Sequence, residues 1–240
     1  MKRATRLRLG ALGGLVGVLA LIAPGALAQS AGGGDGQPFL SIRSVDSADS
    51  ADTVLGVTWT GDEADLDRLQ VTENGREVRL GAPVADTDPR GVVFVVESSA
   101  AMETAMASVK DAVTNLAADL PAGTEMALVS FGDSAQLIRE FTTDPQAIAD
   151  GVDTLAPQGA AALWDGIYVG AQALEDSPEL QPNLVLVSAS PDSASVTPAS
   201  RATGLTTSLG TSVFAVGIEP SAPAAALEQL VGTAGGRYLP

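Results

Sequence analysis

The 240-residue chain contains no cysteine and no histidine. Without cysteine, it has no disulfide, no thiolate metal site and no thiol nucleophile. Without histidine, it has no Ser-His-Asp triad, no imidazole ligand for zinc and no imidazole base. These absences remove most catalytic combinations of residues. We therefore expect a protein that is not an enzyme and that uses no cofactor.

Basic residues are also scarce, with 13 lysines and arginines against 29 acidic residues and a net charge of −16. Four of the basic residues lie within the first eight positions, so the chain without residues 1–28 has 9 basic and 29 acidic residues, a net charge of −20. A surface this acidic repels phosphate backbones. Nucleic acid is therefore excluded as the expected partner.

The amino terminus has the pattern of an export signal. A basic segment at Lys2–Arg8 precedes an apolar run at Gly10–Ile22, and Ala26-Leu27-Ala28 fits a small-x-small cleavage motif. The apolar run is shorter than the roughly 20 residues of a membrane-spanning helix. We expect residues 1–28 to be removed and the mature protein to be extracellular or in the cell envelope. An uncleaved membrane anchor is the alternative.

The first part of the mature chain predicts a small all-β module. Residues 29–37 are a glycine-rich linker, and residues 38–88 carry strand patterns. Large apolar residues recur at every second position in Leu55, Val57 and Trp59, between Val54, Gly56 and Thr58, as in a half-buried strand. Asn74-Gly75 lies between two further alternating runs, which is a strong signal for a β-hairpin with a two-residue turn.

From residue 91 to residue 240, strands alternate with helices. Gly91–Val96 is continuously apolar, as expected for a strand buried on both faces of a parallel sheet. Only three residues separate the strands predicted at Met126–Phe131 and Ala135–Phe141, so these two must be antiparallel. Asp144-Pro145 has the N-cap and first-turn residues of a helix. The predicted fold is an α/β, doubly wound, mostly parallel sheet with one antiparallel edge strand.

Six segments in this region resemble, in order, the von Willebrand factor A-type family. They are VVFVVESSAAM, MALVSFGDSAQLIREF, APQGAAALWDGI, NLVLVSASPD, TSVFAVGI and VGTAGGRY. The resemblance implies a Rossmann-like domain at 91–240 that binds partners through the loops at the carboxyl ends of its strands.

The resemblance also implies a metal-ion-dependent adhesion site, from which this sequence departs. The family's five ligand positions are an aspartate, two serines, a threonine and a second aspartate, and they fall on Glu97, Ser99, Ala101, Ala161 and Ala189. A divalent cation such as magnesium requires about six oxygen ligands at short distances. Three methyl groups offer none, and the glutamate is one methylene too long. We expect a degenerate site that holds no metal.

The same loops form the expected binding face, which also includes Ser98, Met102 and Asp192. Met102 is expected to be exposed as an apolar contact, and Asp192 to lie near enough to turn toward the degenerate site. We expect a protein partner at this face or at the β module. The alternative is a divalent-metal-dependent adhesin that uses an altered ligand set. Trp164 is expected to pack in the core, and Asp165 to brace the start of its helix.

A second resemblance concerns the order of the modules. LQVTENGREV followed by GVVFVVESSAAM is similar to exported bacterial proteins of the same domain family, some of which belong to pilus or secretion assemblies. This resemblance implies an adhesion role at a bacterial cell surface. The family's last strand begins at Arg237-Tyr238-Leu239, so we expect the domain to lack its final helix. Either the natural chain continues past Pro240, or a partner covers the sheet. Apart from an uncleaved signal, any membrane attachment is expected in residues beyond Pro240.

Overall fold

The structure is a computed structural model that divides into two compact units, Met1–Thr87 and Asp88–Pro240. The residues that it describes are 3–10, 19–22, 39–46, 52–60, 70–73, 76–78, 84–85, 88–218 and 222–240. The expected linker at 29–37 lies outside these residues. The domain boundaries expected from the sequence stay predictions.

The first unit contains only strands among its described residues. They are β1 (Arg3–Gly10), β2 (Leu19–Ile22), β3 (Phe39–Asp46), β4 (Asp52–Thr60), β5 (Gln70–Glu73), β6 (Arg76–Val78) and β7 (Val84–Ala85). One sheet has the order β3-β4-β1-β7 and the other the order β2-β5-β6. Glu73 pairs with Arg76 in antiparallel register, which confirms the hairpin predicted around Asn74-Gly75.

Strands β1 and β2 fall within the expected export signal, and removal of that segment stays a prediction. Among the residues that the structure describes, no helix is both long and apolar enough to cross a bilayer.

The second unit is built on a six-stranded sheet of order β10-β9-β8-β11-β12-β13. Its strands are β8 (Arg90–Glu97), β9 (Glu125–Phe131), β10 (Ala135–Thr142), β11 (Gln181–Ser188), β12 (Ser212–Gly217) and β13 (Arg237–Leu239). Every neighbouring pair is parallel except β9 and β10, which form an antiparallel hairpin at one edge. The fold class predicted from the sequence is confirmed.

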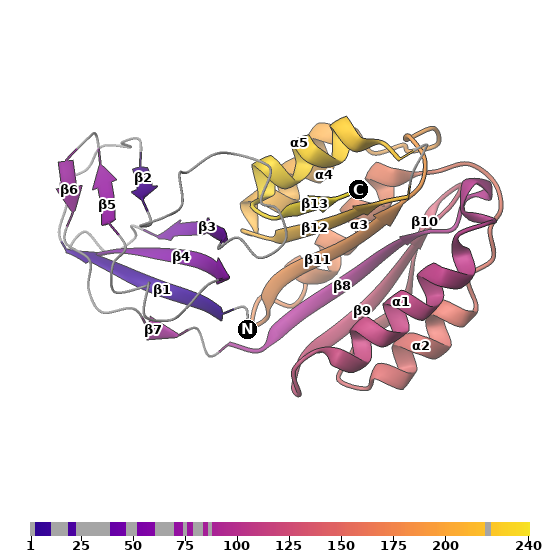
Figure 1. The fold of residues 1–240 in the computed structure, drawn as a ribbon, viewed down its shortest axis with the longest axis horizontal. Coiled ribbons are helices and arrows are strands. Elements are labelled where there is room, and N and C mark those ends of the chain that lie inside the picture. The colour runs from indigo at the N-terminus through magenta and orange to yellow at the C-terminus, as the bar shows by residue number, and fades with distance from the viewer. Residues whose placement is uncertain are drawn as a thin grey trace. The chain divides into compact units, whose positions relative to one another are not determined.

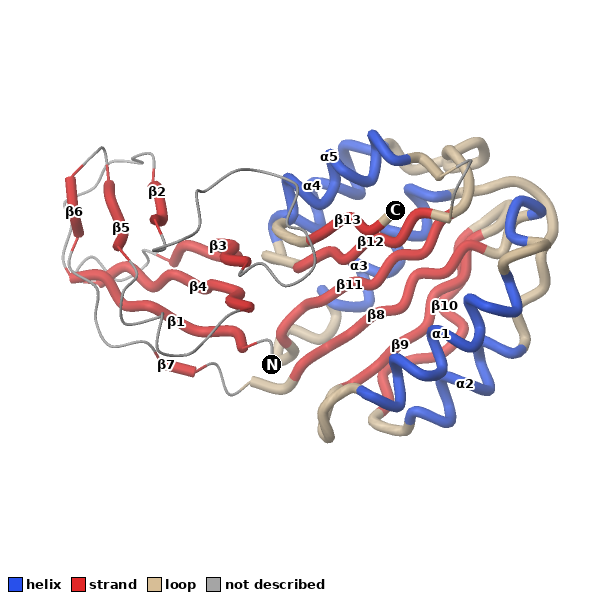
Figure 2. Tube along the Cα trace, in the orientation of Figure 1, coloured by secondary structure: helices blue, strands red, loops and turns tan. Residues whose placement is uncertain are grey.

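Five helices cover the two faces of this sheet (Figures 1 and 2). They are α1 (Met106–Asp119), α2 (Pro145–Asp153), α3 (Leu163–Glu175), α4 (Ala199–Ser208) and α5 (Ala224–Ala234). Helices α1 and α2 lie on one face, and α3, α4 and α5 lie on the other. Each face has its own apolar core because alternate residues of the buried strands point to opposite sides. Val93 and Val95 contribute to one core, and Val92, Phe94 and Val96 contribute to the other.

Local capping sets two of the helix starts. Asp144 accepts a hydrogen bond from the backbone N–H of Gln146 at 3.0 Å, and Pro145 occupies the first turn, as predicted. A short 3₁₀ turn, η2 (Ala100–Met102), precedes α1 and is capped by the hydroxyl of Ser99.

On the sheet face that carries α1 and α2, strands β11 and β12 are less completely covered than β8 and β9. Val185, Val216 and Ile218 on this face are only partly buried. No helix of the described residues adds to α1 and α2 here. The expectation that the domain lacks its final helix stays a prediction.

Candidate functional site

The carboxyl ends of β8 and β11 lie side by side, which brings two distant segments together. Val96 pairs with Val187 in parallel register, so Glu97 and Ser188 are neighbours at the last residue of each strand. Loops at this edge of an open α/β sheet form its natural binding crevice. The candidate site is therefore built from the segments that follow these two strands.

Five hydrogen bonds converge on the fully buried carboxylate of Glu97. Its Oε1 accepts from the hydroxyls of Ser99 and Ser190, each at 2.5 Å. Its Oε2 accepts from the hydroxyl of Ser188 at 2.8 Å and from the backbone N–H groups of Ala189 at 2.7 Å and Ser190 at 3.2 Å. A carboxylate can be buried at low cost only when donors surround it in this way.

Ser98 belongs to the neighbouring connection rather than to the Glu97 cluster. Its backbone N–H donates to the carbonyl of Phe131 at 2.7 Å, and its carbonyl accepts from Gln158 at 2.9 Å. Its hydroxyl accepts from Ser130 at 2.7 Å. Ser98 therefore ties the end of β8 to β9 and to the loop before α3.

The three alanines at the expected ligand positions bring only methyl groups. Ala161 and Ala189 are buried, whereas Ala101 is exposed. Ala161 contributes through its backbone, because its carbonyl accepts from Ser193 at 2.9 Å and from Ala194 at 3.1 Å. The N–H of Ala189 is one of the five donors to Glu97.

Two expectations for the face need correction. Met102 is fully buried and packs in the core beneath α1, so the prediction of an exposed apolar contact is wrong. The 3₁₀ turn at Ala100–Met102 rotates the side chain inward. Asp192 does not turn toward Glu97. It accepts a hydrogen bond from Ser195 at 2.5 Å on the exposed part of the β11–α4 loop.

Asp165 holds that loop against the start of α3. Its carboxylate accepts from the backbone N–H groups of Val196 at 3.1 Å and Thr197 at 2.7 Å, and Ser195 caps the helix from the same loop. Partial burial alone would raise the pKa of Asp165. Hydrogen bonds from the Thr197 side chain and from the two backbone N–H groups outweigh it and hold this pKa below its ordinary value of 3.8.

We expect Asp165→Asn to destabilise the folded protein by about 1 kcal/mol at pH 7, because an amide accepts these hydrogen bonds less strongly than a carboxylate. The folded-state pKa is lowered, so the contribution of Asp165 is fully present above pH 3.8 and is lost as the pH falls through the folded-state value. Chemical denaturation of both proteins across this range measures the difference. A gap that persists undiminished below the folded-state pKa would contradict the assignment.

The loop that Asp165 holds also presents an apolar side chain that the sequence analysis missed. Val196 is 89% exposed, more than any other exposed large apolar residue among those described. It is the one large apolar residue in the polar segment 190–198. Its backbone N–H donates to Asp165 across 31 residues of sequence, which holds the backbone of the loop at this point.

The charge on the face is of one sign. Glu103, Asp133 and Asp192 are exposed there. Asp133 also accepts from the backbone N–H of Ala160 at 2.7 Å. The loops at 98–105, 132–134, 156–162 and 189–198 contain no lysine or arginine. The face is therefore acidic around one exposed apolar side chain.

The residues at this site do not fit a bound cation. The hydroxyls of Ser99, Ser188 and Ser190 are engaged by the Glu97 carboxylate, and the side chains of Ala101, Ala161 and Ala189 offer no oxygen. Cations such as magnesium and calcium need several oxygen lone pairs. Within the described ranges, no group of three or more aspartate, glutamate, histidine or cysteine residues is placed to hold a metal ion.

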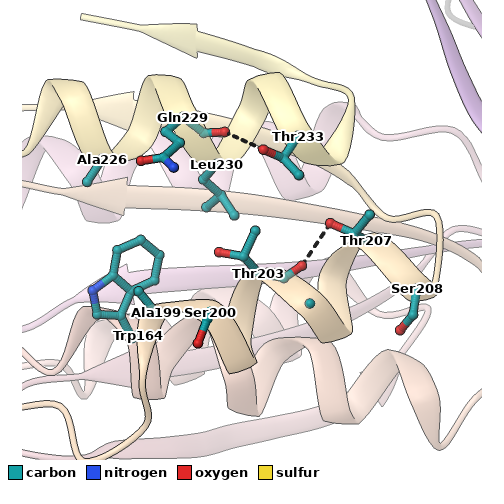
Figure 3. Close-up of a pocket in the computed structure, with 11 residues that line it drawn as sticks. Trp164, Ala199, Ser200, Thr203, Thr207, Ser208, Ala226, Gln229, Leu230 and Thr233 are labelled. Atoms are coloured by element: carbon teal, nitrogen blue, oxygen red, sulfur yellow. Dashed lines mark hydrogen bonds between the residues drawn. The ribbon is translucent and has the colours of Figure 1, made fainter.

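A separate groove of about 600 Å³ runs between α4 and α5 near the start of α3 (Figure 3). Trp164 lies at one end, partly buried and packed against the core, as expected. No charged residue lines the groove. The hydroxyls of Thr207 and Thr233 donate back to their own helices at 2.8 and 2.9 Å. The groove shares no lining residue with the Glu97 cluster.

Residues 92–191 match the model of a family described as the von Willebrand factor type A domain. This part of the chain is similar to the von Willebrand factor type A domain, and its sheet and helices have that fold. No curated protein matches the chain.

Solved structures with the same fold come from distant proteins. A von Willebrand factor type A protein from Catenulispora acidiphila is 18% identical, with a TM-score of 0.59, over 65% of this chain and 39% of that one. An aerotolerance-related membrane protein from Bacteroides fragilis is 14% identical, with a TM-score of 0.54, over 62% of this chain and 90% of that one.

A third structure with this fold contains a metal ion. The proximal thread matrix protein 1 of the mussel byssus, solved with a zinc-occupied MIDAS motif, is 18% identical. Its TM-score is 0.54, over 64% of this chain and 44% of that one. The present chain thus spans less than half of the mussel and Catenulispora proteins, and the likeness to all three shows the fold.

Proposed function

We propose that this protein is a non-enzymatic interaction module of the cell exterior or envelope that binds a protein partner without a divalent cation. Its binding face is the set of loops around Glu97, which includes Ser98, Ser99, Ala101 and Asp192. The observation that carries the proposal is the Glu97 cluster. The Glu97 carboxylate lies at the position of the family's first metal ligand, and its two oxygens accept five hydrogen bonds from the protein itself.

Two further features support a protein partner at this face. Von Willebrand factor type A domains are generally interaction modules, and the match to this family covers the loops that follow β8 and β9 and the loop before α3, and ends at residue 191 within the β11–α4 loop. Val196 offers an exposed apolar contact among acidic residues, on a loop whose backbone is held by Asp165. Binding surfaces commonly combine a small apolar centre with charges that select the partner, so a basic partner surface is favoured.

The proposed location follows from the amino-terminal pattern. An export signal at residues 1–28, cleaved after Ala28, would deliver a strongly acidic mature chain to the exterior or the envelope. The bacterial module order is consistent with a surface, pilus or secretion assembly. Neither the composition nor the face favours nucleic acid.

We expect a partner captured from cell-surface extract by the mature chain to be retained equally in EDTA and in magnesium. Val196→Glu should reduce the capture at least tenfold, because it removes the apolar contact and adds a charge. Leu116→Glu is the matched control, since Leu116 is 41% exposed on α1 and outside the loops. Quantitative mass spectrometry of the captured proteins measures both effects.

Two results would count against the proposal. Capture that requires magnesium and is abolished by EDTA would favour the metal-dependent adhesin instead. Capture that is equally reduced by Val196→Glu and Leu116→Glu would place the binding surface elsewhere.

A further inference from the structure

We infer that the Glu97 carboxylate takes over the structural task of a metal ion, fixing the binding face in one arrangement with an internal anion. This inference rests on the proposed function in that it concerns the same face, and it specifies how that face is held. It predicts a face that no cation switches on or off.

The first step of the argument is the direction of the hydrogen bonds. In a metal site, the lone pairs of several oxygens converge on a cation. Here three hydroxyl groups and two backbone N–H groups direct hydrogens toward two carboxylate oxygens. The polarity of the cluster is thus reversed, with a negative centre and a shell of donors. Charge-assisted hydrogen bonds of this kind are stronger than neutral ones.

The second step is what the cluster connects. Glu97 is the last residue of β8, Ser99 lies in the loop that follows it, and Ser188 and Ser190 lie at the end of β11 and beyond. The donors from Ser188 to Ser190 are 91 to 93 residues away from Glu97 in sequence, although they contact it in space. A single carboxylate therefore ties two loops together, which is what a shared ion does between loops in a metal site.

The third step is that the surrounding loops are also held by the protein's own groups. Asp133 accepts from the N–H of Ala160, and the hydroxyl of Ser193 accepts from the N–H of Ala161 at 3.2 Å. Asp165 holds the far end of the β11–α4 loop at Val196. Each loop of the face has an internal anchor, so none depends on an ion for its position.

Chemical rescue provides the test. Glu97→Ala retains the β-carbon and removes the next methylene and the carboxylate, which together have the shape of acetate. We expect this variant to melt several degrees below the wild type, and the amide protons of Ala189 and Ser190 to exchange at least tenfold faster. Sodium acetate at neutral pH should restore at least half of both losses in a saturable way. Sodium chloride and magnesium chloride at the same ionic strength should not.

Restoration by magnesium, or acetate no more effective than chloride, would overturn the inference. If Glu97→Ala does not fold, Glu97→Gln retains the volume and removes the charge. It should accelerate exchange of the same two amides at least tenfold, whereas the matched control Glu125→Gln, at the opposite end of the neighbouring strand β9, should not. Unchanged exchange in Glu97→Gln would also overturn it. These measurements need no partner, so their outcome is independent of the capture experiment.

Discussion

Restoring the four family residues, by Glu97→Asp with Ala101→Ser, Ala161→Thr and Ala189→Asp, is expected to create a divalent-cation site that we expect the wild-type protein to lack. The shorter aspartate vacates the centre of the cluster, and the other three changes supply oxygen ligands where methyl groups now lie. At a cation concentration a hundredfold above Kd, binding to the folded state alone adds about 2.7 kcal/mol of stability. For a domain of this size, the melting temperature should rise by roughly 5–10 °C.

The same variant should be less stable than the wild type before cation is added. Two carboxylates then face one another without a counter-charge, and the donors around Glu97 lose their acceptor. Thermal melts in EDTA and in millimolar magnesium, manganese or calcium measure both effects. The control variant combines Ala101→Ser and Ala161→Thr but retains Glu97 and Ala189, and it should melt identically with and without cation, as the wild type should. A cation-dependent shift in the control or the wild type would contradict the account.

The second large effect is expected at the contact between α3 and the sheet. A β-carbon at Gly166 would lie 2.7 Å from the Cδ1 atom of Phe131, and one at Gly170 would lie 2.9 Å from the Cγ2 atom of Val95. These glycines let the helix approach the strands, and α3 in turn carries Asp165 to the loop of the binding face. We expect Gly166→Ala to destabilise the domain by about 1–3 kcal/mol, because packed ring and backbone atoms must move.

A glycine on the neighbouring helix provides the matched control. A β-carbon at Gly204 of α4 would meet no atom within 4 Å. Gly204→Ala should therefore stabilise the protein by about 0.5–1 kcal/mol, through helix propensity alone. Urea denaturation of the two variants should give shifts of opposite sign. Shifts of the same sign would mean that the close packing of α3 on the sheet is wrong.

Much of the α/β domain was predictable because its signals are local. The continuous apolar run at Gly91–Val96 is typical of a strand buried on both faces, and β8 spans it. The three-residue link after Phe131 allows only an antiparallel hairpin, and Asp144-Pro145 is a complete local capping signal. Each of these features depends on residues within a few positions of one another.

The candidate site was predictable only in part, because its contacts are long-range. The alignment of family motifs indicates which ligand positions are methyl groups, but not what fills the space between them. The hydroxyls of Ser188 and Ser190 reach Glu97 only through the parallel register of β8 with β11, which no local pattern encodes. Met102 was wrongly expected at the surface because its orientation depends on a single 3₁₀ turn. The backbone position of Val196 depends likewise on a distant carboxylate.

Anomalous diffraction from crystals of the wild-type protein soaked in manganese tests the central claim most directly, since it locates both the carboxylate and any ion. The account predicts no manganese peak between the ends of β8 and β11, and a Glu97 carboxylate within hydrogen-bonding distance of Ser99, Ser188 and Ser190. A manganese peak at this position, with the serine oxygens turned toward the ion and Glu97 displaced, would contradict it.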